Sequence, residues 1–275
     1  YQDYVIQDEV TYSDGWGDWT KGGGSSLELT DPHSDNRFGM NWKGSDETTK
    51  STNLWTTIQH SGALDNGLGS ANELQVIYLQ EGECLLDNVS VVQGTTTNCN
   101  DDLESGIANW IIRGSHSRST WETTEGYLGG KSLHVRASGQ GDPRSSHDET
   151  LVADFSNQVA RTLSPAPSGA TTTTIQGKAR WLAGWPYVVL QLQGFWLEAV
   201  GCLQIPTNLG TPGLRNSRHT ANAGPAIDGV AHSPVRPEAG SNVVVTCRVD
   251  DPDGIGLVNL RYRVDPSYVT NTTAM

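Results

Sequence analysis

The stretch Glu73–Val91, which reads ELQVIYLQEGECLLDNVSV, decides the fold. It holds two short runs of apolar and β-branched residues around a turn, which is typical of neighbouring β-strands. A second paired run, YVVLQLQGFWLEAVG, occupies residues 187–201. Each paired run closes a segment that opens on a Gly–Trp phrase and contains a short S-L-x-[LV] strand, as in GSSLEL and GKSLHVRAS. Two similar units of this size predict tandem β-domains and argue against one enzyme domain with a single deep cleft.

The sequence therefore predicts an all-β chain with tandem antiparallel jelly-roll β-sandwiches at residues 1–93 and 103–205. Residues 206–237, rich in Pro, Gly, Asn and Arg, indicate an extended linker. Residues 238–275 contain two strong strands, 243–249 and 257–264, around the turn DDPDG. They are typical of the start of an immunoglobulin-like domain, cut short or completed by another chain. Residues 151–163 fit either a helix, by their spacing of four, or a strand pair.

The charge of the chain argues against some classes of partner. The net charge is −13, and residues 1–100 carry 15 acidic and 4 basic side chains, a balance of −11. Such a surface repels nucleic acid and anionic lipid, so neither is an expected partner. It fits a neutral ligand or cations, or simply a solvated acidic surface that aids solubility.

The four cysteines, Cys84, Cys99, Cys202 and Cys247, form no C-x-x-C pair and lie at no metal-ligand spacing from a histidine. A Cys84–Cys99 disulfide is one option that sequence alone leaves open. No run of 18 apolar residues exists, so no membrane insertion is expected. The chain begins at Tyr1 without a signal peptide and has the character of a mature or excised piece.

No catalytic motif of a known kind is present, and the chain is not expected to be an enzyme. The acidic residues are better candidates for structural calcium, since Ca²⁺ prefers carboxylate and carbonyl oxygens in loops. Asp87 closes the first segment, and Asp8 and Glu9 lie near its start. These three are the candidate ligands, with turn stabilisation by the Asp side chains as the alternative.

Aromatic residues are the candidates for ligand binding. Nine Trp against three Phe is an unusual ratio, and a Trp ring suits both a sandwich core and the apolar face of a sugar. Trp185, Tyr187 and Trp121 lie in or beside polar, turn-rich sequence, and they are the predicted glycan-binding residues.

Nearly the whole chain resembles part of large secreted bacterial proteins that combine lamin-tail-like domains with spore-coat-kinase-like regions. The phrases GGGSSLELTDPHSDNRFGMNWKGSDETTKS and LESGIANWIIRGSHSRS carry the resemblance, together with ARWLAGWPYVVLQLQGFWLEAVG. The first residues look like the tail of a lamin-tail-like domain, and the kinase-like part is absent. Both segments are also similar to galactose-binding-like jelly rolls, many of which bind glycans and hold a structural calcium. That resemblance implies Asp87 as a calcium ligand.

The expected function is a non-catalytic glycan-binding or adhesion region of a secreted multidomain protein, extracellular or at the cell surface. Its expected partner is a polysaccharide or cell-surface glycan. One alternative is a structural subunit of an extracellular filament or matrix, which assembles with other copies of the chain by β-strand addition from its C-terminal segment. Another is an accessory fragment of an enzyme.

Overall fold

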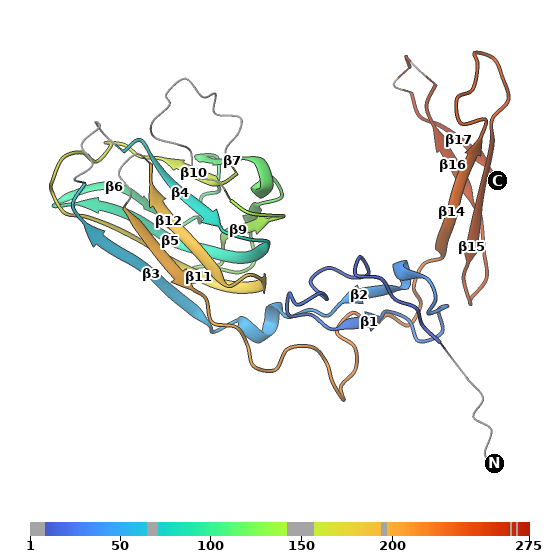
Figure 1. The fold of residues 1–275 in the computed structure, drawn as a ribbon, viewed down its shortest axis with the longest axis horizontal. Helices are drawn as coiled ribbons and strands as arrows, with labels where there is room; N and C mark the ends of the chain where they lie inside the picture. The colour runs from blue at the N-terminus through green and yellow to red at the C-terminus, as the bar shows by residue number, and fades with distance from the viewer. Residues whose placement is uncertain (1–8, 65–70, 142–156, 194–196, 265, 268) are drawn as a thin grey trace. The chain divides into compact units, whose positions relative to one another are not determined.

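The computed structural model describes residues 9–64, 71–141, 157–193, 197–264, 266–267 and 269–275. Within these ranges the ordered elements are β-strands and three short 3₁₀ turns (Figure 1). The predicted all-β class with antiparallel sheets is confirmed. The described residues include no helix long and apolar enough to cross a membrane. The chain divides into two compact units, the larger comprising Lys21–Ser25 and Asp46–Gly210.

The larger unit consists of two antiparallel sheets that face each other across one core (Figure 1). The five-stranded sheet has the order β13 (Glu198–Cys202), β12 (Tyr187–Leu192), β4 (Glu73–Tyr78), β10 (Val159–Thr162), β7 (Trp110–Ile112). The six-stranded sheet has the order β3 (Trp55–Gly62), β11 (Thr173–Gly184), β5 (Gly82–Gln93), β9 (Ser132–Ala137), β8 (Thr120–Glu122), with β6 (Thr96–Asp101) also paired to β5. The turns η2 (Thr48–Ser51) and η3 (Gly114–His116) lie in its connections.

The core forms from apolar residues that alternate with polar ones along the strands. On β11, Ile175, Ala179 and Trp181 are buried between the sheets, whereas Gln176 and Lys178 alternate with them on the outer face. Side chains of successive strand residues point to opposite faces, so this period of two sorts apolar from polar groups. Full burial of an apolar side chain of the size of Ile175 contributes about 1.5–3 kcal/mol to folding.

The prediction of two sandwiches at residues 1–93 and 103–205 is wrong. β4, from the first range, lies between β10 and β12, from the second. β11, from the second range, lies between β3 and β5, from the first. Residues 55–93 of the first range and residues 110–202 of the second therefore contribute interleaved strands to one sandwich. The physical reason is that β4 is buried along its whole length, so it needs neighbours on both edges that its own segment does not supply.

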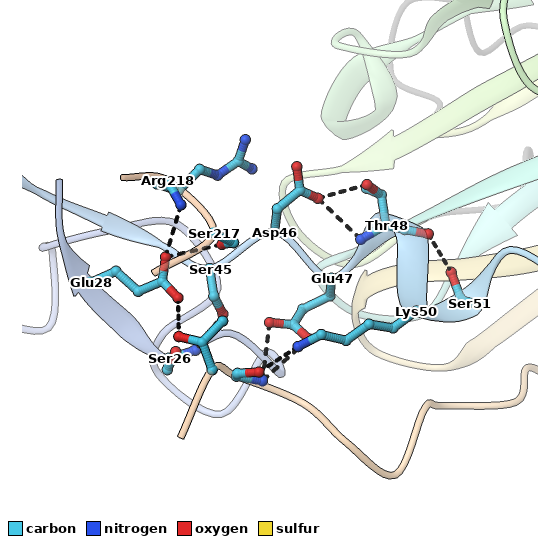
Figure 2. Close-up of polar contacts among 12 residues, drawn as sticks. Ser26, Glu28, Ser45, Asp46, Glu47, Thr48, Lys50, Ser51, Ser217 and Arg218 are labelled. Atoms are coloured by element: carbon cyan, nitrogen blue, oxygen red, sulfur yellow. Dashed lines mark hydrogen bonds and ion pairs between the residues drawn. The ribbon is translucent and has the colours of Figure 1, made fainter. Parts of the chain in front are cut away.

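The smaller unit comprises Tyr1–Thr20, Ser26–Ser45 and Thr211–Met275. Its first part pairs β1 (Leu27–Leu29) with β2 (Trp42–Gly44), which follows the turn η1 (Gly39–Asn41). Residues 211–223 are attached to this pair through Glu28, which is buried. Its carboxylate accepts hydrogen bonds from Thr211 Oγ1, Ser217 Oγ (2.9 Å) and Arg218 N (3.0 Å) (Figure 2).

A second buried carboxylate, Asp31, holds the same segment by accepting a hydrogen bond from Ala223 N at 3.0 Å. The predicted linker at 206–237 is therefore wrong: much of it is attached to the β1–β2 pair, and its last part enters a strand. Within the larger unit, buried Glu47 plays a similar part, because it accepts from Gly210 N at 3.1 Å and pairs with Lys50 Nζ at 2.8 Å (Figure 2).

The last fifty residues form two separate ribbons. β14 (Ala226–Ser233) pairs with β15 (Val244–Asp250), and β16 (Asn259–Tyr262) pairs with β17 (Asn271–Ala274). The predicted strands at 243–249 and 257–264 exist, but they do not pair with each other across the DDPDG turn. Each finds its partner in a segment that the sequence did not identify as a strand.

Candidate functional site

The outer face of the six-stranded sheet carries side chains that are mostly polar. Strand pairing aligns them in cross-strand rows: Ser61, Thr174 and Val92; Gln59, Gln176 and Ser90; Thr57, Lys178 and Asp87; Trp55, Arg180 and Leu85. Hydrogen bonds confirm that neighbours in a row share this face, since Ser61 Oγ lies 2.8 Å from Thr174 Oγ1. We call the solvent-accessible members the polar face: Thr57, Gln59, Ser61, Ser90, Thr174, Gln176, Lys178.

Two aromatic rings border one end of the polar face. Trp55 comes from β3, and Tyr127 comes from the loop between β8 and β9. Their ring centroids are 5.7 Å apart at an interplanar angle of 66°. Tyr127 is 38% exposed and Trp55 is half-buried, so both rings are accessible at the surface. We call this pair the aromatic end.

Two cations lie against the aromatic end. Lys178 Nζ is 4.8 Å from the centroid of the Tyr127 ring, and the Arg180 guanidinium is 5.6 Å from that of Trp55. Arg180 is buried, and its Nη2 forms an ion pair with Glu125 of the β8–β9 loop. Such contacts fix the ring orientations, because a cation is attracted to the negative face of an aromatic ring.

Asp87 holds the loop that carries Tyr127. The residue is fully buried, and its Oδ2 accepts a hydrogen bond from Tyr127 N at 2.7 Å. Its Oδ1 accepts one from Asn88 N at the same distance. Burial raises the pKa of Asp87 above 3.8, and the bonds from Tyr127 and Asn88 oppose that rise. Asp87 therefore acts as an anchor that positions the Tyr127 ring over the sheet.

Two of the three predicted calcium ligands, Asp87 and Glu9, belong to different compact units. Both oxygens of Asp87 face backbone N–H donors, Glu9 is exposed in the other compact unit, and Asp8 lies outside the described residues. In the described ranges, no three His, Cys, Asp or Glu side chains form a group that could hold a metal ion. The Asp87 carboxyl as it stands does not fit a calcium site, and bound calcium stays a prediction.

The predicted glycan-binding residues fall in two places. Trp185 and Tyr187 lie together at the β11–β12 turn, with ring centroids 5.4 Å apart. Trp185 packs against the core, and Tyr187 is as exposed as Tyr127. Trp121 lies on β8 of the six-stranded sheet. Its Nε1 donates to Leu103 O at 2.9 Å, and Lys131 Nζ lies 4.8 Å from its ring centroid. The three do not form one platform.

Sequence reasoning missed the aromatic end and the polar face. The signal was the alternation in WTTIQHS and TTIQGKARW, which places Thr57, Gln59, Gln176 and Lys178 on one side of their strands. The contribution of Tyr127 had no sequence signal, because it depends on how the β8–β9 loop folds onto β5.

The four cysteines are free thiols, so the Cys84–Cys99 disulfide that the sequence left open is not formed. Cys84 and Cys99 are buried, and burial raises the pKa of both thiols, that of Cys84 to about 12. They act as small core residues.

Comparison with family models, with curated proteins and with solved structures finds no match to this chain.

Proposed function

We propose that this chain is a non-catalytic glycan-binding region of a secreted multidomain protein, with the polar face and its aromatic end as the binding surface. The observation that carries the proposal is the accessible Trp55–Tyr127 pair beside a row of hydroxyl and carboxamide side chains on a rigid sheet. Extracellular location and adhesion to a polysaccharide or cell-surface glycan belong to the same proposal.

The chemistry of a sugar matches this surface. A pyranose ring has an apolar C–H face that packs against an aromatic ring, and hydroxyl groups around its edge. Carboxamides and hydroxyls offer both donors and acceptors to such hydroxyls. Thr57, Gln59 and Gln176 extend from the aromatic end along neighbouring strands, so an extended chain of sugars would meet them in succession.

Replacing Tyr127 with Ala should weaken glycan binding by about 1–2 kcal/mol, because it removes the more exposed of the two rings at the aromatic end. Tyr127→Phe keeps the ring and should bind nearly as the parent does. The measurement is affinity electrophoresis in gels that contain single polysaccharides. Leu128→Ala is the control, since Leu128 is the next residue of the loop and is 61% exposed.

Tyr187→Ala separates the two candidate surfaces. The prediction from the sequence places the loss of binding at Trp185 and Tyr187, at the β11–β12 turn. Retained mobility shifts for Tyr187→Ala with lost shifts for Tyr127→Ala support the polar face. The opposite pattern contradicts it, and no retardation of the parent chain in any gel contradicts glycan binding altogether.

A second candidate function, assembly with other copies of the chain, is favoured by the C-terminal ribbons. Each of the four strands pairs with one described neighbour only. Several of their apolar side chains are exposed, including Val230, Val244 and Tyr262. Two-stranded ribbons are marginal in water, and open edges invite strand addition.

Size-exclusion chromatography with light scattering should show concentration-dependent oligomers if these ribbons assemble. Val244→Lys places a charge on β15 and should shift the chain toward the monomer. Val200→Lys is the control, because Val200 is similarly exposed, at 60% against 62%, but lies on β13 of the larger unit. A parent chain that is monomeric at millimolar concentration would exclude this function.

A further inference from the structure

The polar face differs in charge from the protein that carries it. The chain has a net charge of −13, yet the accessible residues of the polar face include no carboxylate. Their one charged group is the ammonium of Lys178. Three carboxylates of the described residues near this end are engaged: Asp87 is buried beneath the loop, Glu125 is paired with Arg180, and Glu104 accepts from Gly130 N and Lys131 N.

Lys178 is held in place without a carboxylate partner among the described residues. Its Nζ donates to Thr57 Oγ1 at 2.7 Å and lies over the Tyr127 ring. An ammonium has three N–H donors, so this bond leaves others for a ligand. A cation fixed between a hydroxyl and an aromatic face loses less side-chain freedom on binding than a free lysine does.

We propose that the site selects glycans that carry a carboxylate, such as a uronic acid, with Lys178 as the residue that binds the acid group. This inference rests on the proposed glycan-binding function. A sugar bound at the aromatic end lies close to the ammonium that covers the Tyr127 ring, where a carboxylate would form a charge-assisted hydrogen bond. The net negative charge opposes any polyanion at long range, so selectivity has to come from this short contact.

The test uses two matched pairs of probes at one fixed ionic strength. Polygalacturonate and its methyl ester share a backbone and differ in the acid group. Dextran sulfate and dextran make the same comparison for a sulfate ester. We expect the full chain to bind polygalacturonate about fivefold more tightly than the methyl ester, the size of one exposed charge-assisted contact.

Variants test whether the preference for polygalacturonate over its methyl ester depends on Lys178. Lys178→Gln should abolish the roughly fivefold preference, and Lys178→Arg should keep most of it, since the cation is retained. Arg118→Gln is the control, because it removes one exposed positive charge from the same unit away from the polar face.

The outcomes separate this inference from the function on which it rests. Equal binding of acid and ester, with both lost in Tyr127→Ala, overturns the acid preference and leaves glycan binding in place. A preference that survives Lys178→Gln overturns the assignment to this residue. Preference for dextran sulfate alone would replace the carboxylate with a sulfate, and binding of no probe would reject both proposals.

Discussion

Replacing Glu28 with Ala should destabilise the smaller unit by about 3 kcal/mol, because it leaves buried donors without an acceptor. In the parent chain the carboxylate accepts from Thr211 Oγ1, from Ser217 Oγ and from Arg218 N, and the residue is only 2% exposed. These bonds join residues nearly 190 positions apart in sequence, so they attach the 211–223 segment to β1.

Trypsin provides a local measurement of that attachment, since Arg215 and Arg218 both lie in the segment. Cleavage there should become faster in Glu28→Ala by a factor set by the lost free energy of local opening, roughly a hundredfold for 3 kcal/mol. Glu28→Gln keeps two acceptor lone pairs, so its cleavage rate should lie between those of the parent chain and Glu28→Ala. Glu238→Ala, at an exposed position of the same unit, should cleave as the parent does. Equal cleavage of Glu28→Ala and the parent would show that the carboxylate does not hold the segment.

Most strands were predictable from the sequence, but their neighbours were not. The two runs within Glu73–Val91 form β4 and β5, and the strand predicted in GKSLHVRAS is β9. The alternation that marks a strand is local, so it is readable along the chain. Sheet order depends on contacts between distant segments. The repeated phrases favoured pairing within each segment, whereas the backbone groups on the edges of β4 and β11 are paired with strands from both segments.

For the candidate site too, the sequence indicates individual residues but not the contacts that they make with distant segments. The sequence predicts Asp87 as a calcium ligand, and the structure shows a carboxyl that is fully buried. Its role could not be derived, because the Tyr127 N–H that it accepts belongs to a loop forty residues away. Trp185 lies in a turn-rich stretch that indicates exposure, yet its ring packs against the core. Flanking polarity is a poor guide to aromatic exposure where a tight turn returns the chain to the core.

The larger unit should lose stability between pH 6.5 and about pH 4, owing to His116. The residue is fully buried, and burial lowers its pKa from 6.5 to about 4. Its Nε2 accepts a hydrogen bond from Tyr78 N at 3.1 Å, which requires the neutral ring with the proton on Nδ1. Nδ1 lies 3.1 Å from Ser115 Oγ, which can accept that proton in a hydrogen bond.

The sign follows from proton binding. Below pH 6.5 His116 becomes protonated in the unfolded chain, whereas in the folded chain it stays neutral down to about pH 4. The unfolded chain therefore binds more protons in this range, and lowering the pH favours unfolding. The full loss is on the order of 3 kcal/mol, from 1.36 kcal/mol per pKa unit. Asp87 acts in the opposite direction, because its pKa is raised by burial and its protonation occurs more readily in the folded chain.

One variant separates the contribution of His116 to the pH dependence from that of the other titratable groups. His116→Gln can still accept from Tyr78 N through Oε1 but does not titrate, so its free energy of unfolding should change less with pH by about 3 kcal/mol between pH 7.5 and pH 4. Urea unfolding at several pH values measures this. His60→Gln, at an exposed position on β3, should keep the pH dependence of the parent chain. If His116→Gln and the parent lose stability in parallel, protonation of His116 is not the cause, and the acid sensitivity of the sandwich belongs to its carboxylates.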